Sequence, residues 1–182
     1  MEEFLVNLEG PILLWIQEYI RCDFLDPIMI FFTKLGDGGT IWIIAALLML
    51  CFKKTRKEGV MVGASLIGSL LFNNMLVKNL VGRTRPYELI EGLQILVEKP
   101  GEFSFPSGHT SSSFAAGVII FLTCPRKIGV PALILAFLIS ISRLYVGVHF
   151  PTDVLGGMVM GTLIAVCIYE VYKKKFMKKQ TN

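Results

Sequence analysis

Residues 142–171 read SRLYVGVHFPTDVLGGMVMGTLIAVCIYEV, a short polar segment followed by a long apolar run. The apolar run, residues 154–171, contains one charged side chain and approaches the length of about 20 residues that a helix needs to cross a bilayer. The stretch therefore predicts a membrane-spanning helix with Arg143, His149 and Asp153 at its N-terminal end.

Four more apolar segments precede this one, at residues 38–52, 59–81, 111–124 and 128–141. The shorter segments reach spanning length when their small and polar flanks are included. In the 182-residue chain 53% of residues are hydrophobic, more than an ordinary soluble domain carries. We expect an all-α, multi-pass transmembrane helical bundle of about five spanning helices, which forms a membrane-embedded domain over residues 38–174.

Residues 1–37 form a different region, because charged and apolar residues are mixed too closely for a clean span. Apolar residues recur at helical spacing in residues 4–20, which predicts an amphipathic helix lying in the membrane interface. The pair Gly10-Pro11 leaves open an alternative, a break that turns this segment into a helical hairpin packed on the bundle.

A second short helix is predicted within the same N-terminal region. Asp26-Pro27 indicates an N-cap followed by proline at the first helical position, and the helix is expected to end near Gly36. We expect these two helices of residues 1–37 to lie in the membrane interface and not to cross the bilayer. An imperfect sixth span is the alternative.

Basic residues gather in alternate connections, at residues 53–57, 126–127 and 173–179. By the positive-inside rule these segments are cytoplasmic, and residues 175–182 form a basic cytoplasmic tail. The remaining connections then face outward. The net charge of +4 does not indicate nucleic acid, because the basic residues serve as topological anchors or belong to the patches described next.

Three short patches on the outward side carry groups that bind or attack a phosphoryl centre. The first holds Lys78 and Arg85, seven residues apart, so one helix would place both on one face until Pro86 stops it. A lysine and an arginine together suit the several oxygens of a phosphate. Taken alone, the patch is more typical of side chains that extend to lipid headgroups.

The second patch, Pro106-Ser107-Gly108-His109, precedes an apolar run. Ser107 is placed to cap a helix whose free N–H groups form an anion site. Gly108 lets the backbone approach a phosphate, and His109 is placed to donate a proton to a leaving oxygen. A helix cap with an exposed histidine is the plainer interpretation.

The third patch contains Arg143, His149 and Asp153. Arg143 ends an apolar run, where it needs an anion or the aqueous boundary. His149 stands two residues before the helix-opening Pro151, and the spacing to Asp153 can bring a carboxylate onto one imidazole nitrogen. The other nitrogen is then free to attack. A capped, salt-bridged helix end is the alternative, but three such patches on one side favour function.

The spacings K-x6-R-P, P-S-G-H and S-R-x5-H-x3-D resemble the three-part signature of the type 2 phosphatidic acid phosphatase family, membrane lipid phosphatases related to vanadium haloperoxidases. The resemblance covers about residues 36–172. It implies that His149 is a nucleophile that forms a phosphohistidine, that Asp153 orients it, and that His109 is the general acid. It also implies that the phosphate oxygens are held by Lys78, Arg85, Ser107, Gly108 and Arg143.

We therefore expect an integral membrane lipid phosphatase with its active site on the extracytoplasmic side. Candidate substrates are isoprenoid diphosphates such as undecaprenyl diphosphate, phosphatidylglycerol phosphate and phosphatidic acid. A lipid phosphotransferase with the same phosphohistidine chemistry is the alternative. The expected partners are the lipid substrate and the bilayer. No cofactor or metal is expected, because both histidines of the chain are committed to phosphoryl chemistry.

Overall fold

The structure, a computed structural model, describes residues 2–180 and is all-helical over that range, which confirms the predicted class. The N-terminal region consists of α1 (Glu2–Trp15), the π-helix η1 (Ile16–Ile20), α2 (Leu25–Leu35) and the 3-10 turn η2 (Asp37–Gly39). The rest consists of α3 (Thr40–Cys51), α4 (Arg56–Ser69), the π-helix η3 (Leu70–Val77), α5 (Lys78–Val81), α6 (Pro86–Leu89), α7 (Gly108–Thr123), α8 (Arg126–Tyr145) and α9 (Pro151–Gln180).

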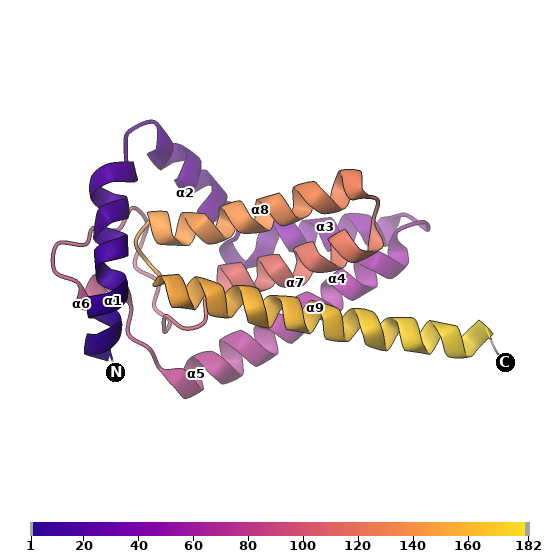
Figure 1. Cartoon of the computed structure of the whole chain (residues 1–182). Helices are drawn as coiled ribbons and strands as arrows, with labels where there is room; N and C mark the ends of the chain where they lie inside the picture. The colour runs from indigo at the N-terminus through magenta and orange to yellow at the C-terminus, as the bar shows by residue number, and fades with distance from the viewer. Residues whose placement is uncertain (1, 181–182) are drawn as a thin grey trace.

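Helix α7 lies at the centre of the bundle, packed against α4, α8 and α9 (Figure 1). Its Ala116 and Ile119 are fully buried and share one core with Trp42 of α3. Small residues on α9 allow a close approach: a Cβ on Gly157 would lie 2.8 Å from the carbonyl oxygen of Ser107. Helix α9 therefore packs directly on the backbone at the start of α7.

Three helical segments are long and apolar enough to cross a membrane: Arg56–Leu89, Arg126–Tyr145 and Pro151–Lys175. A fourth is added if Leu25–Leu35 and Asp37–Cys51, which meet at a bend of 50°, count as one span. Helix α7 has 16 residues and falls short of the roughly 17 to 25 residues that spanning takes. The described chain supports three or four spans, fewer than the predicted five.

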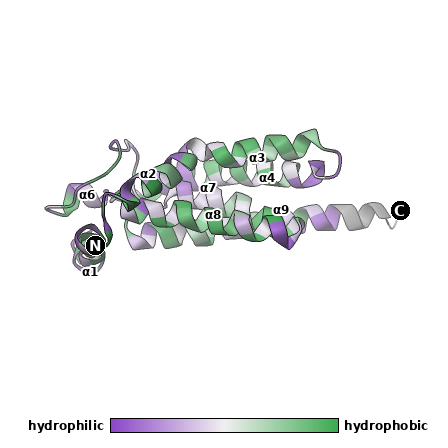
Figure 2. Ribbon diagram, turned by 90° about the horizontal axis from the view of Figure 1, so that it is seen from above, coloured by the Kyte–Doolittle hydropathy of each residue, from purple (hydrophilic) through white to green (hydrophobic). Residues whose placement is uncertain are grey.

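The two ends of the bundle differ in character. Figure 1 places α1, α2, α6 and the connections before α7 and α9 at one end, and the α3–α4 and α7–α8 turns with the C-terminus at the other. Hydrophobic residues predominate along the helices between the two ends of the bundle, and hydrophilic residues gather at the ends (Figure 2). The basic connections at residues 53–57 and 126–127 thus lie at the end opposite to the three predicted patches.

Helix α1 lies across the end of the bundle, nearly at right angles to the long helices in both views (Figures 1 and 2). It runs through Gly10 and Pro11 without a break, so the alternative of a helical hairpin is wrong. Phe4 and Trp15 are exposed on one face, whereas Leu13 is buried. The helix therefore presents apolar side chains both to the bundle and to its surroundings.

Helix α2 begins at Leu25, so Asp26 lies in its first turn and not at the predicted N-cap. The Asp26 carboxylate instead accepts a hydrogen bond of 2.7 Å from the Tyr145 hydroxyl group. The helix ends just before Gly36, as predicted. A Cβ on Gly36 would lie 2.7 Å from Cδ2 of His109, so the end of α2 is in contact with the second patch.

Candidate active site

The three patches meet at one place, the loop-rich end of the bundle. One cavity of about 610 Å³ lies there, and six of the predicted site residues line it: Lys78, Arg85, Gly108, His109, Arg143 and His149. Ser107 and Asp153 do not line this cavity, and both side chains are fully buried. Residues far apart in the sequence are thus brought together around a single space.

Lys78 and Arg85 reach this cavity from two differently oriented backbone segments, so the prediction that they share one helix face is wrong. Helix α5 ends at Val81, and Gly82 follows with a left-handed backbone of φ 59°. Glycine adopts this conformation without a steric penalty. Arg85 then lies in extended chain, and Pro86 opens α6 instead of ending a helix.

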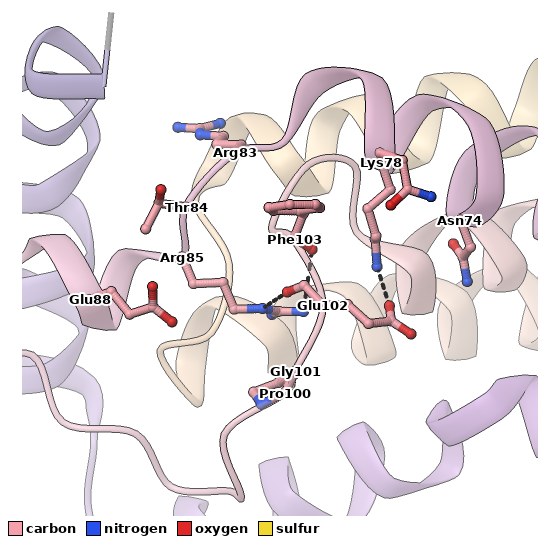
Figure 3. A pocket seen from close by; sticks show the side chains of 11 residues that line it. Asn74, Lys78, Arg83, Thr84, Arg85, Glu88, Pro100, Gly101, Glu102 and Phe103 are labelled. Atoms are coloured by element: carbon pink, nitrogen blue, oxygen red, sulfur yellow. Dashed lines mark hydrogen bonds and ion pairs between the residues drawn. The ribbon is translucent and has the colours of Figure 1, made fainter.

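The loop before α7 holds both cations (Figure 3). Nζ of Lys78 lies 2.6 Å from Oε2 of Glu102, and Nε of Arg85 donates to the Glu102 carbonyl oxygen at 2.7 Å. The hydrogen bond from Lys78 lowers the pKa of the Glu102 carboxyl group. A phosphate that binds Lys78 must therefore compete with this carboxylate.

A second cavity, of about 470 Å³, adjoins the first and is the one drawn in Figure 3. Asn74, Lys78, Arg85 and Glu102 line both cavities. In Figure 3, Lys78 and Asn74 point toward Glu102, whereas Arg83 is turned away from them. The Lys78–Glu102 ion pair therefore lies where the two cavities meet.

The second patch forms the start of α7 as predicted. The Ser107 hydroxyl oxygen accepts hydrogen bonds from the backbone N–H and the hydroxyl group of Thr110, at 3.4 and 3.1 Å. Gly108 follows, and a Cβ there would lie 3.0 Å from the Asn74 side-chain oxygen. His109 reaches across to η2, where its Nε2 lies 2.8 Å from Oδ1 of Asp37.

The third patch surrounds His149, whose residue surface is 1% exposed. Its Nδ1 lies 3.4 Å from Oδ2 of Asp153, and its Nε2 lies 3.4 Å from Nη1 of Arg85. The same Asp153 oxygen accepts hydrogen bonds from the Ser104 hydroxyl group at 2.5 Å and the Phe150 N–H at 2.8 Å. The carboxylate thus favours a proton on Nδ1 and leaves Nε2 facing the cavity.

The protonation states of the two histidines follow from their surroundings. Burial, together with the nearby cations, lowers the pKa of His149 well below its usual range. Its imidazole is therefore neutral at physiological pH, as a nucleophile must be. Burial also lowers the pKa of His109, while the hydrogen bond to Asp37 acts in the opposite direction.

Three residues of the site gave no signal in the sequence patterns: Thr33, Asp37 and Ser104. The Thr33 hydroxyl group accepts a hydrogen bond from Nη1 of Arg143. Asp37 contacts Nε2 of His109, and the Ser104 hydroxyl group lies 3.4 Å from Nδ1 of His149. A search of the flanks of the second patch would have drawn attention to Ser104, three residues before Ser107. Thr33 and Asp37 belong to the N-terminal helices, and only the tertiary fold brings them to the patches.

The larger cavity continues from its cationic end into an apolar groove. The groove is walled by side chains from α3 and from the α4–η3 segment: Ile43, Leu47, Leu50, Leu66, Ile67 and Leu70. Several of them, Leu47 and Ile67 included, are exposed on the side of the bundle. The cavity thus suits a ligand with an anionic head and a long hydrocarbon chain.

An apolar helical bundle with a cationic cavity and two histidines at one end defines a membrane protein equipped for phosphoryl chemistry. The chain belongs to the PAP2 superfamily, whose family model matches residues 58–177 and so includes all three patches. This confirms the resemblance inferred from the motif spacings.

Individual relatives agree with this assignment. The undecaprenyl-diphosphatase of Sulfolobus acidocaldarius is 32% identical over 155 residues, which cover 85% of this chain and 74% of that protein. The crystal structure of Aquifex aeolicus LpxE superposes with a TM-score of 0.77 at 24% identity, covering 90% and 95% of the two chains. The transmembrane PAP2 type phosphatidylglycerolphosphate phosphatase of Bacillus subtilis gives a TM-score of 0.69 at 28% identity, covering 85% and 80%.

Proposed function

We propose that this protein is an integral membrane lipid phosphatase that hydrolyses a phosphomonoester or diphosphate of a membrane lipid through a phosphohistidine at His149. The observation that carries the proposal is the single cavity of about 610 Å³, in which both histidines and three cations adjoin an apolar groove. A phosphorylated lipid would place its phosphate at the polar end and its chain along α3 and α4. Membership of the PAP2 superfamily supports this phosphatase chemistry.

In the first step, Nε2 of His149 attacks the phosphorus atom and the P–O bond to the lipid breaks. Asp153 keeps the proton on Nδ1, so the lone pair of Nε2 remains available. His109 transfers a proton to the leaving oxygen, and the products are a phosphohistidine and a lipid with one phosphoryl group fewer.

In the second step, water attacks the phosphorus atom of the phosphohistidine. His109, now neutral, takes a proton from this water, the P–N bond breaks, and inorganic phosphate leaves. Throughout, Lys78, Arg85 and Arg143 neutralise the charge spread over the phosphoryl oxygens. Gly108 and the capped start of α7 add backbone N–H donors, while Ser107 supports the cap.

These steps use protein groups alone. Among the described residues, no three His, Cys, Asp or Glu side chains lie where they could hold a metal ion. Turnover should therefore survive excess EDTA. Activity lost on chelation and restored by a divalent ion would contradict the mechanism.

The substrate class is best tested with a panel in matched detergent micelles. Undecaprenyl diphosphate comes first because a relative is an undecaprenyl-diphosphatase, and phosphatidylglycerol phosphate follows because a solved relative is a phosphatase for that lipid. Phosphatidic acid and glucose phosphate complete the panel. We expect lipid phosphates to be far better substrates; equal turnover of glucose phosphate would refute the lipid assignment. Phosphate released should equal substrate consumed, whereas a deficit would indicate a phosphotransferase.

We propose that the chain crosses the membrane several times and that its active site lies on the extracytoplasmic side. The basic connections at residues 53–57 and 126–127 lie at the opposite end of the bundle, and this supports a cytoplasmic position for that end. Cys22 and Cys51 offer a matched pair, because both are exposed free thiols. In intact cells an impermeant thiol reagent should label a variant that keeps only Cys22 and spare one that keeps only Cys51. The reverse pattern would place the site in the cytoplasm.

A further inference from the structure

Glu9 is a buried carboxylate on a helix whose exposed residues are mostly apolar. It lies on α1, outside the matched residues 58–177, and is 3% exposed. A buried charge is costly unless it is paired and hydrogen-bonded. Glu9 meets this condition at the start of α9: its carboxylate accepts hydrogen bonds from the Thr152 N–H at 2.9 Å and the Thr152 hydroxyl group at 2.8 Å.

Arg83 is the second member of this cluster. Its Nη2 lies 3.5 Å from Oε1 of Glu9, and its Nη1 donates to the Thr152 hydroxyl oxygen at 2.6 Å. The same Nη1 donates to Oδ1 of Asp153 at 2.7 Å, and the guanidinium group lies 4.2 Å from the centre of the Phe150 ring. Arg83 does not line the larger cavity and is turned away from Lys78 (Figure 3). Its charge is therefore directed at Asp153.

Asp153 connects Arg83 to His149, the proposed nucleophile. Its Oδ1 is occupied by Arg83, and its Oδ2 faces Nδ1 of His149. With both oxygens held, the carboxylate has one orientation relative to the imidazole ring. Packing reinforces the cluster, because Leu13 of α1 lies in one apolar core with Phe150, the residue next to His149.

We propose that Glu9 and Arg83 are positioning residues for His149. Glu9 fixes the guanidinium group of Arg83, and Arg83 fixes the Asp153 carboxylate that holds the imidazole proton on Nδ1. The interfacial helix α1 is then part of the reactive geometry and not only a membrane anchor. This inference rests on the proposed role of His149 as the nucleophile.

Glu9→Gln tests the inference, because the substitution removes the charge and keeps the volume. The rate of His149 phosphorylation should fall, so we expect kcat to drop about tenfold to a hundredfold, as is typical when the group that orients a reactive side chain is lost. The loss should be equal for the lipid and a soluble aryl phosphate, with KM unchanged. A higher KM for the lipid alone, or no change, would show that Glu9 only tethers α1.

Gln17→Ala is the matched control. Gln17, on η1 just after α1, also bonds the N-terminal region to a loop. Its side chain accepts a hydrogen bond from the Gln94 N–H at 2.7 Å and donates one to the Gly92 carbonyl oxygen at 3.1 Å. Neither of these two bonds involves Asp153. Its removal should change kcat by less than about twofold. Thermal unfolding in detergent checks that both variants are folded, and Thr152→Val replaces Glu9→Gln if that variant is not.

A double-mutant cycle separates positioning from a structural role. If Glu9 acts through Asp153, Glu9→Gln should lower the residual aryl phosphatase activity of Asp153→Asn by less than about twofold. Equal losses in both backgrounds would overturn the inference. Full activity of Glu9→Gln beside an inactive His149→Ala would refute this inference alone, whereas full activity of His149→Ala would refute the proposed function itself.

Discussion

The two histidine regions of the site are built in opposite ways. His149 lies in the connection between α8 and α9, is almost completely buried, and faces a carboxylate that is itself buried. His109 stands on the first turn of α7 with 19% of its side chain exposed, and its partner Asp37 is 63% exposed. One imidazole is enclosed by protein, and the other is partly exposed to solvent.

This difference fits two chemical tasks. A nucleophile benefits from a fixed orientation and a neutral ring, which burial and nearby cations enforce. A general acid must exchange its proton between the substrate and water in each turnover, so it needs contact with solvent and a partner that stabilises the protonated ring. The comparison therefore predicts that changes in the two regions have different consequences.

The largest effect is expected from His149→Ala. Without an imidazole no phosphohistidine forms, so turnover of both lipid and soluble substrates should fall below detection. Rapid quenching of the wild-type enzyme should trap an acid-labile phosphoryl group on His149, mapped by mass spectrometry. Full activity of the variant would refute the phosphohistidine mechanism, and with it the different roles assigned to His149 and His109.

A smaller and more selective effect is expected from His109→Ala. A lipid oxygen leaves poorly without a proton, so kcat on a lipid phosphomonoester should fall about 10²- to 10⁴-fold. An aryl oxide leaves without protonation, so the burst of aryl oxide released as His149 becomes phosphorylated should be affected much less, although hydrolysis of the phosphohistidine slows with either substrate. Equal losses in the phosphorylation step with the two substrates would show that His109 binds phosphate and does not act as an acid.

Local signals in the sequence predicted the parts of the fold that depend on neighbours in the chain. Ser107 caps α7, and Pro151 opens α9, where the residue types indicated. The seven-residue spacing predicts one helix for Lys78 and Arg85, but the left-handed backbone of Gly82 ends α5 between them. The five predicted spans and the three or four that length and apolar composition select differ at α7, whose apolar run belongs to a 16-residue helix packed among its neighbours.

The candidate site also contains residues that local patterns indicate and residues that only the tertiary fold brings in. The spacing in the chain indicates the motif residues, since each patch is short and continuous. Asp37, Thr33 and Glu9 were not, because each meets its partner only after α1 and α2 fold over the end of the bundle. Glu9 in particular had the sequence context of a solvated charge on an amphipathic helix, and only its buried partners reveal another role.

The smallest effect, and the one most specific to the His109 region, is expected from Asp37→Asn. The hydrogen bond from His109 to Asp37 raises the pKa of His109 against the lowering effect of burial. His109 must be protonated to act, so kcat/KM declines as pH rises through this pKa, whereas burial lowers the pKa of His149 well below its usual range and keeps that imidazole neutral near pH 7. Asparagine keeps an acceptor and removes the charge, so the pKa of His109 should fall and the alkaline limb should move to lower pH. Activity at neutral pH should drop by about tenfold or less, with little change on the acid side of the profile. A uniform loss at every pH would mean that Asp37 only positions the ring, and an unchanged profile would separate it from catalysis altogether.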